Sequence, residues 1–324
     1  MIEIVPRSLN LDLIGKKKIF LVFSLVLVLL SLFGLVTKGL SYGIDFVGGA
    51  EVQIGFVKPI SVEILRQNLE TSGFLNVIVQ RLGEENESNY LIKTNGDKSQ
   101  LKGISKAVES SLEKLMPHSE FEVRKVDVVG PGAGVDLKNK GFFAILFALV
   151  CILVYVSIRF GFFYGPAAVV ALVHDTIVLL GVYVFLEREF SLQTVAAMLT
   201  VIGYSNNDTI IVFDRIRETL RLHPYQSLRN NINRSVSETL SRTVLTSVCT
   251  LMVVGSLLIF GGATIHEFSF ALFVGIIIGT YSSIFVATPI VVILVQFVTS
   301  NRGSRKVLAA PIQGDVSDRS EIIS

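Results

Sequence analysis

The chain contains six stretches of mostly apolar residues, each long enough to form an α-helix that crosses a lipid bilayer. A hydrocarbon core about 30 Å thick needs about 20 such residues in one helix. The stretches are residues 19–37, 142–158, 164–186, 192–213, 244–260 and 268–298. They predict a multi-pass membrane protein with a six-helix α-helical transmembrane bundle.

The composition agrees with a membrane protein. Of the 324 residues, 51% are hydrophobic and 17% are charged, whereas an ordinary soluble domain carries about 25% charge. The two cysteines, Cys151 and Cys249, both fall in apolar stretches. We interpret them as small apolar side chains and expect no disulfide in a polar, exported segment.

Basic residues are distributed unevenly between the two sides of the predicted bundle. Three lysines at positions 16–18 precede the first span, and six arginines lie in the connection 214–243. The positive-inside rule then places the N-terminus (1–18), the Arg-rich connection and the tail (299–324) in the cytoplasm. The apolar part of the first span is too long for a typical signal peptide, so we expect the span to remain uncleaved as a membrane anchor.

Residues 38–140, between the first two spans, form a long polar segment on the outer side of the membrane. Its pattern predicts strands at 50–56, 76–82, 89–94 and 121–129 and helices at 61–73 and 98–116. The order βαββαβ is that of a ferredoxin-like α+β domain. Its nearly balanced charges argue against nucleic-acid binding. It has no cluster with metal-ligand spacing, so we expect no metal and no cofactor.

Asp208 lies inside the fourth span, within the stretch GYSNNDT at 203–209. A charge at the bilayer centre costs about 2.5–3.5 kcal/mol on insertion scales, and such residues usually face the bundle interior and mark a pathway or relay. Tyr204 shares a helix face with Asp208, and we interpret Asn207 as a supporting residue. Because consecutive residues point about 100° apart, Asn206 is expected to contact a different neighbour.

Arg242 opens the fifth span, and Thr246 lies one turn further along the same face. The long arginine side chain could reach toward Asp208 from the cytoplasmic side. A carboxyl group in a low dielectric holds its proton more readily, while a nearby arginine favours its release. A changing distance between the two groups would therefore move a proton, and we predict a proton relay formed by Asp208 and Arg242. A packing role for the pair, or coupling to Na⁺ instead of protons, stays open.

His174 and Asp175 are adjacent polar residues near the middle of the third span. Asp175 could join the relay, or it could only accept hydrogen bonds from a neighbouring helix; both interpretations stay open. Glu267 lies at the expected outer start of the last span, where the helix dipole favours a carboxylate. We assign Glu267 no further role.

Catalysis of a covalent reaction is the least favoured function. Two aspartates on adjacent spans also occur in intramembrane aspartyl proteases, but those use Tyr-Asp and Gly-x-Gly-Asp motifs. Here His174 precedes Asp175, and Asn207 precedes Asp208. The sequence contains no HExxH, no Gly-x-Ser-x-Gly and no P-loop. We expect that the protein is not an enzyme.

Motifs along the whole chain resemble those of a known family. They are YGIDFVGG (42–49), VVGPGAG (128–134), ALVHDTIVLLG (171–181), VIGYSNNDTIIVFDRIRE (201–218), LSRTVLTSVCTLM (240–252) and FGGATIHEFSFALFVGIIIGTYSSIFVATP (260–289). In combination they are similar to the SecF subunits of the SecD–SecF protein-export complex, within the RND-type transporter superfamily. The motif after the first span carries Gly43, Asp45, Gly48 and Gly49.

The resemblance implies an accessory subunit of the bacterial protein translocase. Such a subunit works with SecD in the bacterial cytoplasmic (inner) membrane and uses the proton-motive force to promote late steps of preprotein export through SecYEG. It implies contacts with SecD, SecYEG, unfolded preprotein and membrane lipid, and half of an RND-type bundle in this chain. The intramembrane Asp and Arg of the family fall on Asp208 and Arg242. Asn206 departs from the family, which usually has an apolar residue there.

Two other functions stay open at this stage. One is an RND-type exporter of small molecules or lipids, although the segment 38–140 leaves little room for a substrate pocket and exit duct. The other is a passive scaffold that stabilises the translocon without ion flux.

Overall fold

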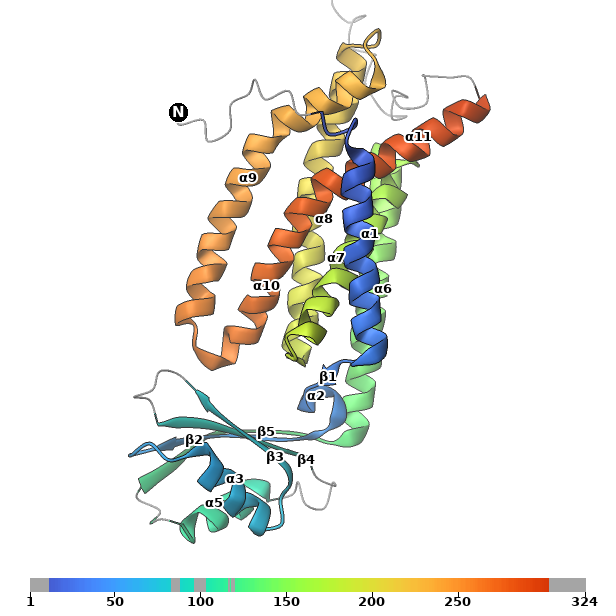
Figure 1. The fold of residues 1–324 in the computed structure, drawn as a ribbon. Coiled ribbons are helices and arrows are strands. Elements are labelled where there is room, and N and C mark those ends of the chain that lie inside the picture. The colour runs from blue at the N-terminus through green and yellow to red at the C-terminus, as the bar shows by residue number, and fades with distance from the viewer. Residues whose placement is uncertain (1–11, 83–87, 96–102, 116, 118–119, 303–324) are drawn as a thin grey trace, which may run out of the picture.

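The computed structural model describes residues 12–82, 88–95, 103–115, 117 and 120–302. The described chain has two parts, a bundle of long helices and a small sheet domain below it (Figure 1). We call the end of the bundle where α1 begins the upper end, and the end beside the sheet domain the lower end. The first eleven residues of the expected N-terminal segment and most of the expected tail lie outside the described residues, as does the start of the expected helix 98–116.

The bundle consists of long helices, most of which run between its two ends (Figure 1). They are α1 (Lys17–Thr37), α6 (Pro131–Phe160), α7 (Tyr164–Phe185), α8 (Leu192–Leu222), α9 (Leu228–Phe260), α10 (Gly262–Ser282) and α11 (Thr288–Arg302), with a π-helical turn at Ser283–Ala287. The π-helical turn joins α10 to α11 without a break. A single membrane-length segment, Ile265–Phe297, therefore covers most of both helices.

Five helical segments in the described chain are long and apolar enough to cross a membrane. They are Lys17–Thr37, Gly132–Phe160, Tyr164–Phe185, Leu228–Phe260 and Ile265–Phe297. The fourth predicted span, 192–213, lies in α8, a helix of 31 residues that is not among them. The structure thus shows a membrane-type helical protein with five apolar segments, and the six-span count stays a prediction.

Several helices extend beyond the spans expected from hydropathy. Pro131 begins α6, eleven residues before the expected span at 142. The connection 214–243 is mostly helical, because α8 ends at Leu222 and α9 begins at Leu228. Ser227 caps α9 by accepting a hydrogen bond from the backbone of Asn230. Hydropathy marks the apolar part of a helix, whereas proline and capping residues mark where it starts.

The expectation for Glu267 needs correction. Because α10 begins at Gly262, Glu267 lies in the second turn and not at the helix start. Its Oε1 accepts a hydrogen bond of 2.8 Å from Arg188 Nη1. An ion pair between neighbouring helix ends thus replaces the expected helix-dipole contact.

The sheet domain is built from four strands and two helices. These are β2 (Gly49–Phe56), α3 (Val62–Thr71), β3 (Leu75–Leu82), β4 (Asn89–Asn95), α5 (Ile104–Glu113) and β5 (Phe121–Val129). All neighbouring strands are antiparallel, in the spatial order β3-β4-β2-β5. Alternate residues of the central strands, such as Val52 and Ile54, are buried together with Leu65 and Leu112 of the helices. The period of two along a strand places this core on one face of the sheet.

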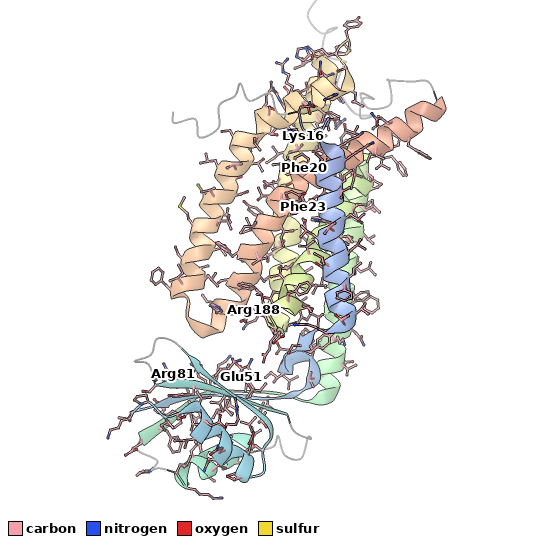
Figure 2. All side chains as sticks on the ribbon, in the orientation of Figure 1. Lys16, Phe20, Phe23, Glu51, Arg81 and Arg188 are labelled. Atoms are coloured by element: carbon pink, nitrogen blue, oxygen red, sulfur yellow. The ribbon has the colours of Figure 1, made fainter. Side chains whose placement is uncertain are left out.

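Two-residue strands connect the domain to the lower end of the bundle. They are β1 (Ser41–Tyr42) and β6 (Glu189–Phe190), which pair in parallel. A short helical turn, α2 (Ile44–Val47), follows β1 and leads into β2. Figure 2 shows Arg188 at the lower end of the bundle and Glu51 on the sheet beneath it.

Apolar side chains cover the outer surface of the bundle. Phe33 of α1, Phe147 of α6 and Ile259 of α9 are each more than 60% exposed. In contrast, α7 is packed inside, with Ala167, Ala168 and Ala171 fully buried. An apolar surface of this kind is suited to contact lipid or other membrane helices. Polar side chains inside such a bundle are therefore unusual.

Candidate functional site: polar groups inside the helical bundle

Asp175 lies at a junction of three helices. Its Oδ2 accepts hydrogen bonds from Ser205 of α8 at 2.7 Å and from Ser282 of α10 at 2.8 Å. Its Oδ1 lies 3.1 Å from Nδ1 of His174. Asp175 is only 2% exposed, and a buried carboxylate needs several such partners. Of the two interpretations left open by the sequence, this geometry matches an acceptor of hydrogen bonds from neighbouring helices.

Glycine allows the close approach of α8 and α10 at this junction. A Cβ atom added at Gly279 would lie 2.8 Å from Cβ of Ser205, and one at Gly275 would lie 2.3 Å from Val201. Small residues of this kind let helix backbones approach closely in membranes. Ser282 directly precedes the π-helical turn Ser283–Ala287, and such turns are frequent at functional sites.

Asp208 is almost fully buried, with 1% of its surface exposed, on the face of α8 that meets α9. Ser247 of α9 lies beside its carboxyl group, in position to donate a hydrogen bond. The hydroxyl of Ser247 is also 2.8 Å from that of Thr280 on α10. Asp208 Oδ2 has no hydrogen-bond partner in the described part of the chain. A buried carboxyl oxygen without a partner is a position where a proton or a cation can bind.

Arg242 does not form an ion pair with Asp208 within the described residues. Its side chain is exposed and acts on Asp208 through its charge at longer range. It lines a cavity of about 740 Å³ at the upper end of the bundle, together with Asp214 of α8 and Arg159 of α6. Thr246, on the same face of α9, donates a hydrogen bond of 3.0 Å to the Arg242 carbonyl. The predicted pair is thus separated in this conformation, with a cavity beside its arginine.

The other polar residues of α8 point in different directions. The Tyr204 hydroxyl donates a hydrogen bond of 3.3 Å to Thr250 of α9, so Tyr204 and Asp208 both face α9. Asn207 is exposed on the outer surface and makes no hydrogen bond with the residues described. Asn206 is half-buried, and its Oδ1 has no partner among these residues. The structure therefore places the Asn207 side chain on the exposed surface of the bundle, outside the Asp208 cluster.

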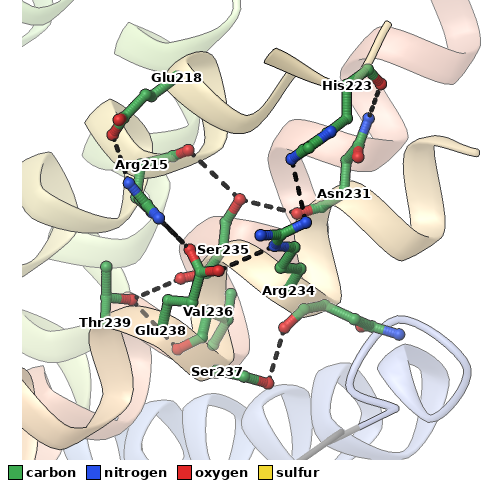
Figure 3. A network of polar contacts seen from close by, with 11 residues as sticks. Arg215, Glu218, His223, Asn231, Arg234, Ser235, Val236, Ser237, Glu238 and Thr239 are labelled. Carbon is green, nitrogen blue, oxygen red and sulfur yellow. Dashed lines mark hydrogen bonds and ion pairs between the residues drawn. The ribbon is translucent and has the colours of Figure 1, made fainter. Parts of the chain in front are cut away.

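Figure 3 shows a network of polar contacts between α8 and α9. Several of its residues line the cavity at the upper end of the bundle. Arg215 of α8 contacts Glu218 on its own helix and Glu238 on α9. Glu238 also accepts a hydrogen bond of 2.8 Å from Arg234. Glu238 is thus paired with arginines of both α8 and α9. The network leaves Arg242 as a cavity-lining arginine with no ion pair among the described residues.

The motif GIDFVGG forms the junction between bundle and sheet domain. Gly43 donates a hydrogen bond of 2.9 Å from its backbone to Phe190. Asp45 Oδ2 accepts one of 2.8 Å from the backbone of Leu192, the first residue of α8. Gly48 and Gly49 have φ values of 84° and 156°, which favour glycine. The residues of this motif thus shape a bend, and Asp45 contacts the helix that carries Asp208.

The described part of the chain contains no group of three or more His, Cys, Asp or Glu that could hold a metal ion. The hydroxyl groups of Ser205, Ser247, Thr280 and Ser282 were not identified from the sequence. Serine and threonine are common in membrane helices, so their positions alone give no signal. A weak signal was available in Ser205, which lies one turn from Asp208.

Comparison with known proteins assigns the chain to a family. Residues 107–296 match the model of the protein export membrane protein SecD/SecF, C-terminal, and residues 33–60 match that of the SecD/SecF GG motif. The protein translocase subunit SecF of Calditerrivibrio nitroreducens is 41% identical, over 90% of this chain and 97% of that protein. The chain belongs to the SecF family. The SecF of Rickettsia typhi is 39% identical, over 90% of this chain and 94% of the relative.

Solved structures agree with this family. The crystal structure of SecDF from Thermus thermophilus, described as a translocon-associated membrane protein, matches with a TM-score of 0.76 and 35% identity. The match covers 90% of this chain and 39% of that one. A SecDF structure in a super-membrane-facing form matches with a TM-score of 0.68 and 34% identity, over 94% and 41% of the two chains. This chain thus spans about two fifths of the SecDF chains.

Proposed function

We propose that this SecF-family protein works with SecD as an accessory subunit of the bacterial protein translocase. In this proposal the two proteins use the proton-motive force to promote late steps of preprotein export through SecYEG. The observation that carries it is Asp208, a buried carboxyl group in α8 with one oxygen unpaired within the described residues. The relatives are translocase subunits, which supports protein export over the alternative of a small-molecule exporter.

The separation of Asp208 and Arg242 supports a two-state mechanism. Proton coupling requires one state in which the carboxyl group accepts a proton and another in which a nearby cation favours its release. Here Asp208 faces Ser247 and has no ion pair among the residues that the structure describes, and Arg242 lies beside the cavity. A rigid-body change that brings Arg242 toward Asp208 would supply the second state. The membrane potential contributes about 2.3 kcal/mol per charge per 100 mV to such a transition.

The proposal includes the number of membrane spans and the fold of the sheet domain. We propose that α8 also crosses the membrane, as the fourth of six spans, since α9 and α10 pack against it along the bundle. We also propose that the sheet domain is ferredoxin-like, because its element order and strand order β3-β4-β2-β5 follow the split βαβ arrangement. Both termini then lie in the cytoplasm of a bacterial cell, with the sheet domain on the outer side of the inner membrane.

A separate SecD partner completes the proposed complex. The relatives are SecF subunits that this chain matches over nearly their whole length, and the matched SecDF chains contain a further part, which supports a separate SecD as the partner. The apolar outer surface of the bundle offers contacts to SecD, SecYEG and lipid, and the sheet domain is the proposed contact for unfolded preprotein. We propose no enzymatic activity, because the mechanism needs only proton binding and movement.

Replacement of Asp208 by Asn tests the proposal. The complex with SecD is measured for preprotein release in inverted vesicles with an imposed proton gradient. Asn keeps the size of the side chain but cannot carry a proton, so gradient-dependent release should fall to the level without a gradient. The control is Asp136→Asn, an exposed carboxylate on α6, which should leave release unchanged.

Unchanged release by the Asp208→Asn complex, at normal protein levels and SecD association, would refute proton coupling and favour a passive scaffold. Exchange of Na⁺ for K⁺ in the same assay separates the two ions. If release depends on a sodium gradient and not on a proton gradient, Asp208 binds Na⁺ instead.

A further inference from the structure

Residues 41–48 lead from the bundle into the sheet domain, and we call them the connector. Asp45 of the connector directly contacts α8, the helix that carries Asp208. Its carboxylate accepts a hydrogen bond from the backbone N–H of Leu192, at the first position of α8. The first backbone N–H groups of a helix have no partner within the helix. Ser191 serves a different one, since its hydroxyl accepts from Thr194. The Asp45 carboxylate thus accepts a hydrogen bond from a backbone N–H that would otherwise be unpaired, at the positive end of the helix dipole.

The connector residues on both sides of Asp45 are packed against the bundle. The backbone of Gly43 donates to Phe190, and the rings of Phe46 and Phe190 are stacked with their centroids 5.6 Å apart. Gly134 of α6 lies so close that an added Cβ would be 2.7 Å from the Phe46 carbonyl oxygen. Asp45 therefore projects from a segment that is packed between α6 and the start of α8.

A second contact joins the sheet itself to the same place. Lys93 of β4 forms an ion pair with Glu189 of β6, two residues before the capping residue of α8. Lys93 also lies 3.8 Å from Glu51 of β2. The central strands of the domain and the motif GIDFVGG thus both reach the segment that opens α8.

We propose that Asp45 is a positioning residue that couples movement of the sheet domain to α8 and hence to Asp208. The helix α8 is continuous from Leu192 to Leu222. Asp208 lies sixteen positions after Leu192, which is about 24 Å at the rise of an α-helix. A displacement or rotation at the first turn is carried along a continuous helix to the carboxyl group. This inference rests on the proposed function, because the coupled event is proton binding at Asp208.

The variant Asp45→Ala tests the coupling in the complete complex with SecD. It removes the contact to Leu192 and leaves every side chain around Asp208 in place. Preprotein release driven by the proton gradient should fall at least about fivefold, the lower range of coupling energies between sites. Proton uptake into vesicles, followed with a pH-sensitive dye, should keep at least half of its rate. The control Asp136→Asn should change neither.

A distance measurement detects the loss of positioning directly. Spin labels are placed at Ile78 of the sheet and Ile259 of α9, both exposed, after Cys151 and Cys249 have been replaced by serine. The wild-type contact should give one narrow distance distribution, and Asp45→Ala should broaden or shift it. This readout does not depend on export. It remains informative if Asp208→Asn shows that proton coupling itself is wrong.

A disulfide provides the rescue. Ser41 and Glu189 are paired positions of β1 and β6, so cysteines at both can fix the connector to the start of α8. In the Asp45→Ala variant, the oxidised disulfide should restore release, and its reduction should abolish the gain. The same cysteine pair with Asp45 intact controls for the loss of Glu189. Wild-type release or wild-type distances in Asp45→Ala, or failure of the oxidised disulfide to restore release, would overturn the proposal.

Discussion

The hydroxyl of Ser205 on α8 donates a hydrogen bond of 2.7 Å to the carboxyl group of Asp175 on α7. Ser282 of α10 donates to the same oxygen. Three helices of the bundle, α7, α8 and α10, thus meet at the Asp175 carboxyl group. Its partner Ser205 lies on α8, three residues before Asp208. The two buried aspartates differ in kind, since Asp175 is fully engaged and Asp208 has an oxygen with no partner in the described chain.

Replacement of Asp175 by Asn should destabilise the bundle. The carboxyl group of Asp175 has an oxygen facing the two serine hydroxyls and another facing His174. An amide has only one such oxygen, so either the serines or His174 must face an NH₂ group and cannot donate a hydrogen bond to it. A buried polar group left unpaired costs about 1–3 kcal/mol. The midpoint of thermal unfolding in detergent should fall. The control is Ser256→Ala, whose exposed hydroxyl bonds only to its own helix at Met252; an equal loss in both variants would contradict the assignment.

Replacement of Gly279 by Ala should also destabilise the protein, because the new methyl group would lie 2.8 Å from Ser205. Overpacking of this kind costs about 1–3 kcal/mol. Gly203 on α8 is a matched control with no atom within 4 Å of an added Cβ. Gly203→Ala should leave the thermal midpoint of the isolated chain unchanged or slightly higher. Equal midpoints for the two variants would show that α8 and α10 can separate without cost.

Replacement of Arg242 by Met should abolish gradient-dependent release without lowering thermal stability. Arg242 is exposed and has no ion pair among the described residues, so its removal leaves no buried charge unpaired. In the proposed mechanism, the charge of Arg242 is needed only when the bundle brings it toward Asp208. Release and the thermal midpoint are measured on the same preparation. Full release by Arg242→Met, together with loss in Asp208→Asn, would remove the arginine from the mechanism and leave Asp208 as the sole carrier.

The pH dependence of the sheet domain should reflect Glu51. Burial raises the pKa of Glu51 above its usual value of 4.5, although Lys93 opposes the shift. The folded domain therefore binds this proton more tightly than the unfolded chain, and its stability should decrease as pH rises from about 4.5 through the raised pKa. Glu51→Gln should remove this part of the decrease, seen in unfolding midpoints between pH 4.5 and pH 7.

The control for Glu51 is Glu63→Gln, an exposed carboxylate of α3 that lies beside Arg66. It should leave the slope with pH unchanged. A steeper loss of stability with rising pH in Glu51→Gln would contradict the assigned sign.

The sequence by itself determined the elements and the unusual residues. Apolar runs marked the helices of the bundle, and the alternation in AEVQIGF marked β2, because both patterns depend on neighbouring residues in the chain. The burial cost of charge singled out Asp208 and Asp175, and both are buried. The helix ends were harder to predict: α6 begins at Pro131, eleven residues before its expected apolar span. Hydropathy does not detect such an extension, whereas proline is favoured at the first position of a helix.

The tertiary structure decided which polar groups meet. Asp175 bonds to residues 30 and 107 positions away, and Asp45 to one 147 positions away. No local pattern encodes such contacts, since they depend on how the helices pack, and the packing follows from features such as the close approach of Gly279 to Ser205. The same packing leaves Asn207 exposed and Arg242 beside a cavity. From the sequence alone, both were expected close to Asp208. Sequence thus located the costly charges, and packing determined which of them found a partner.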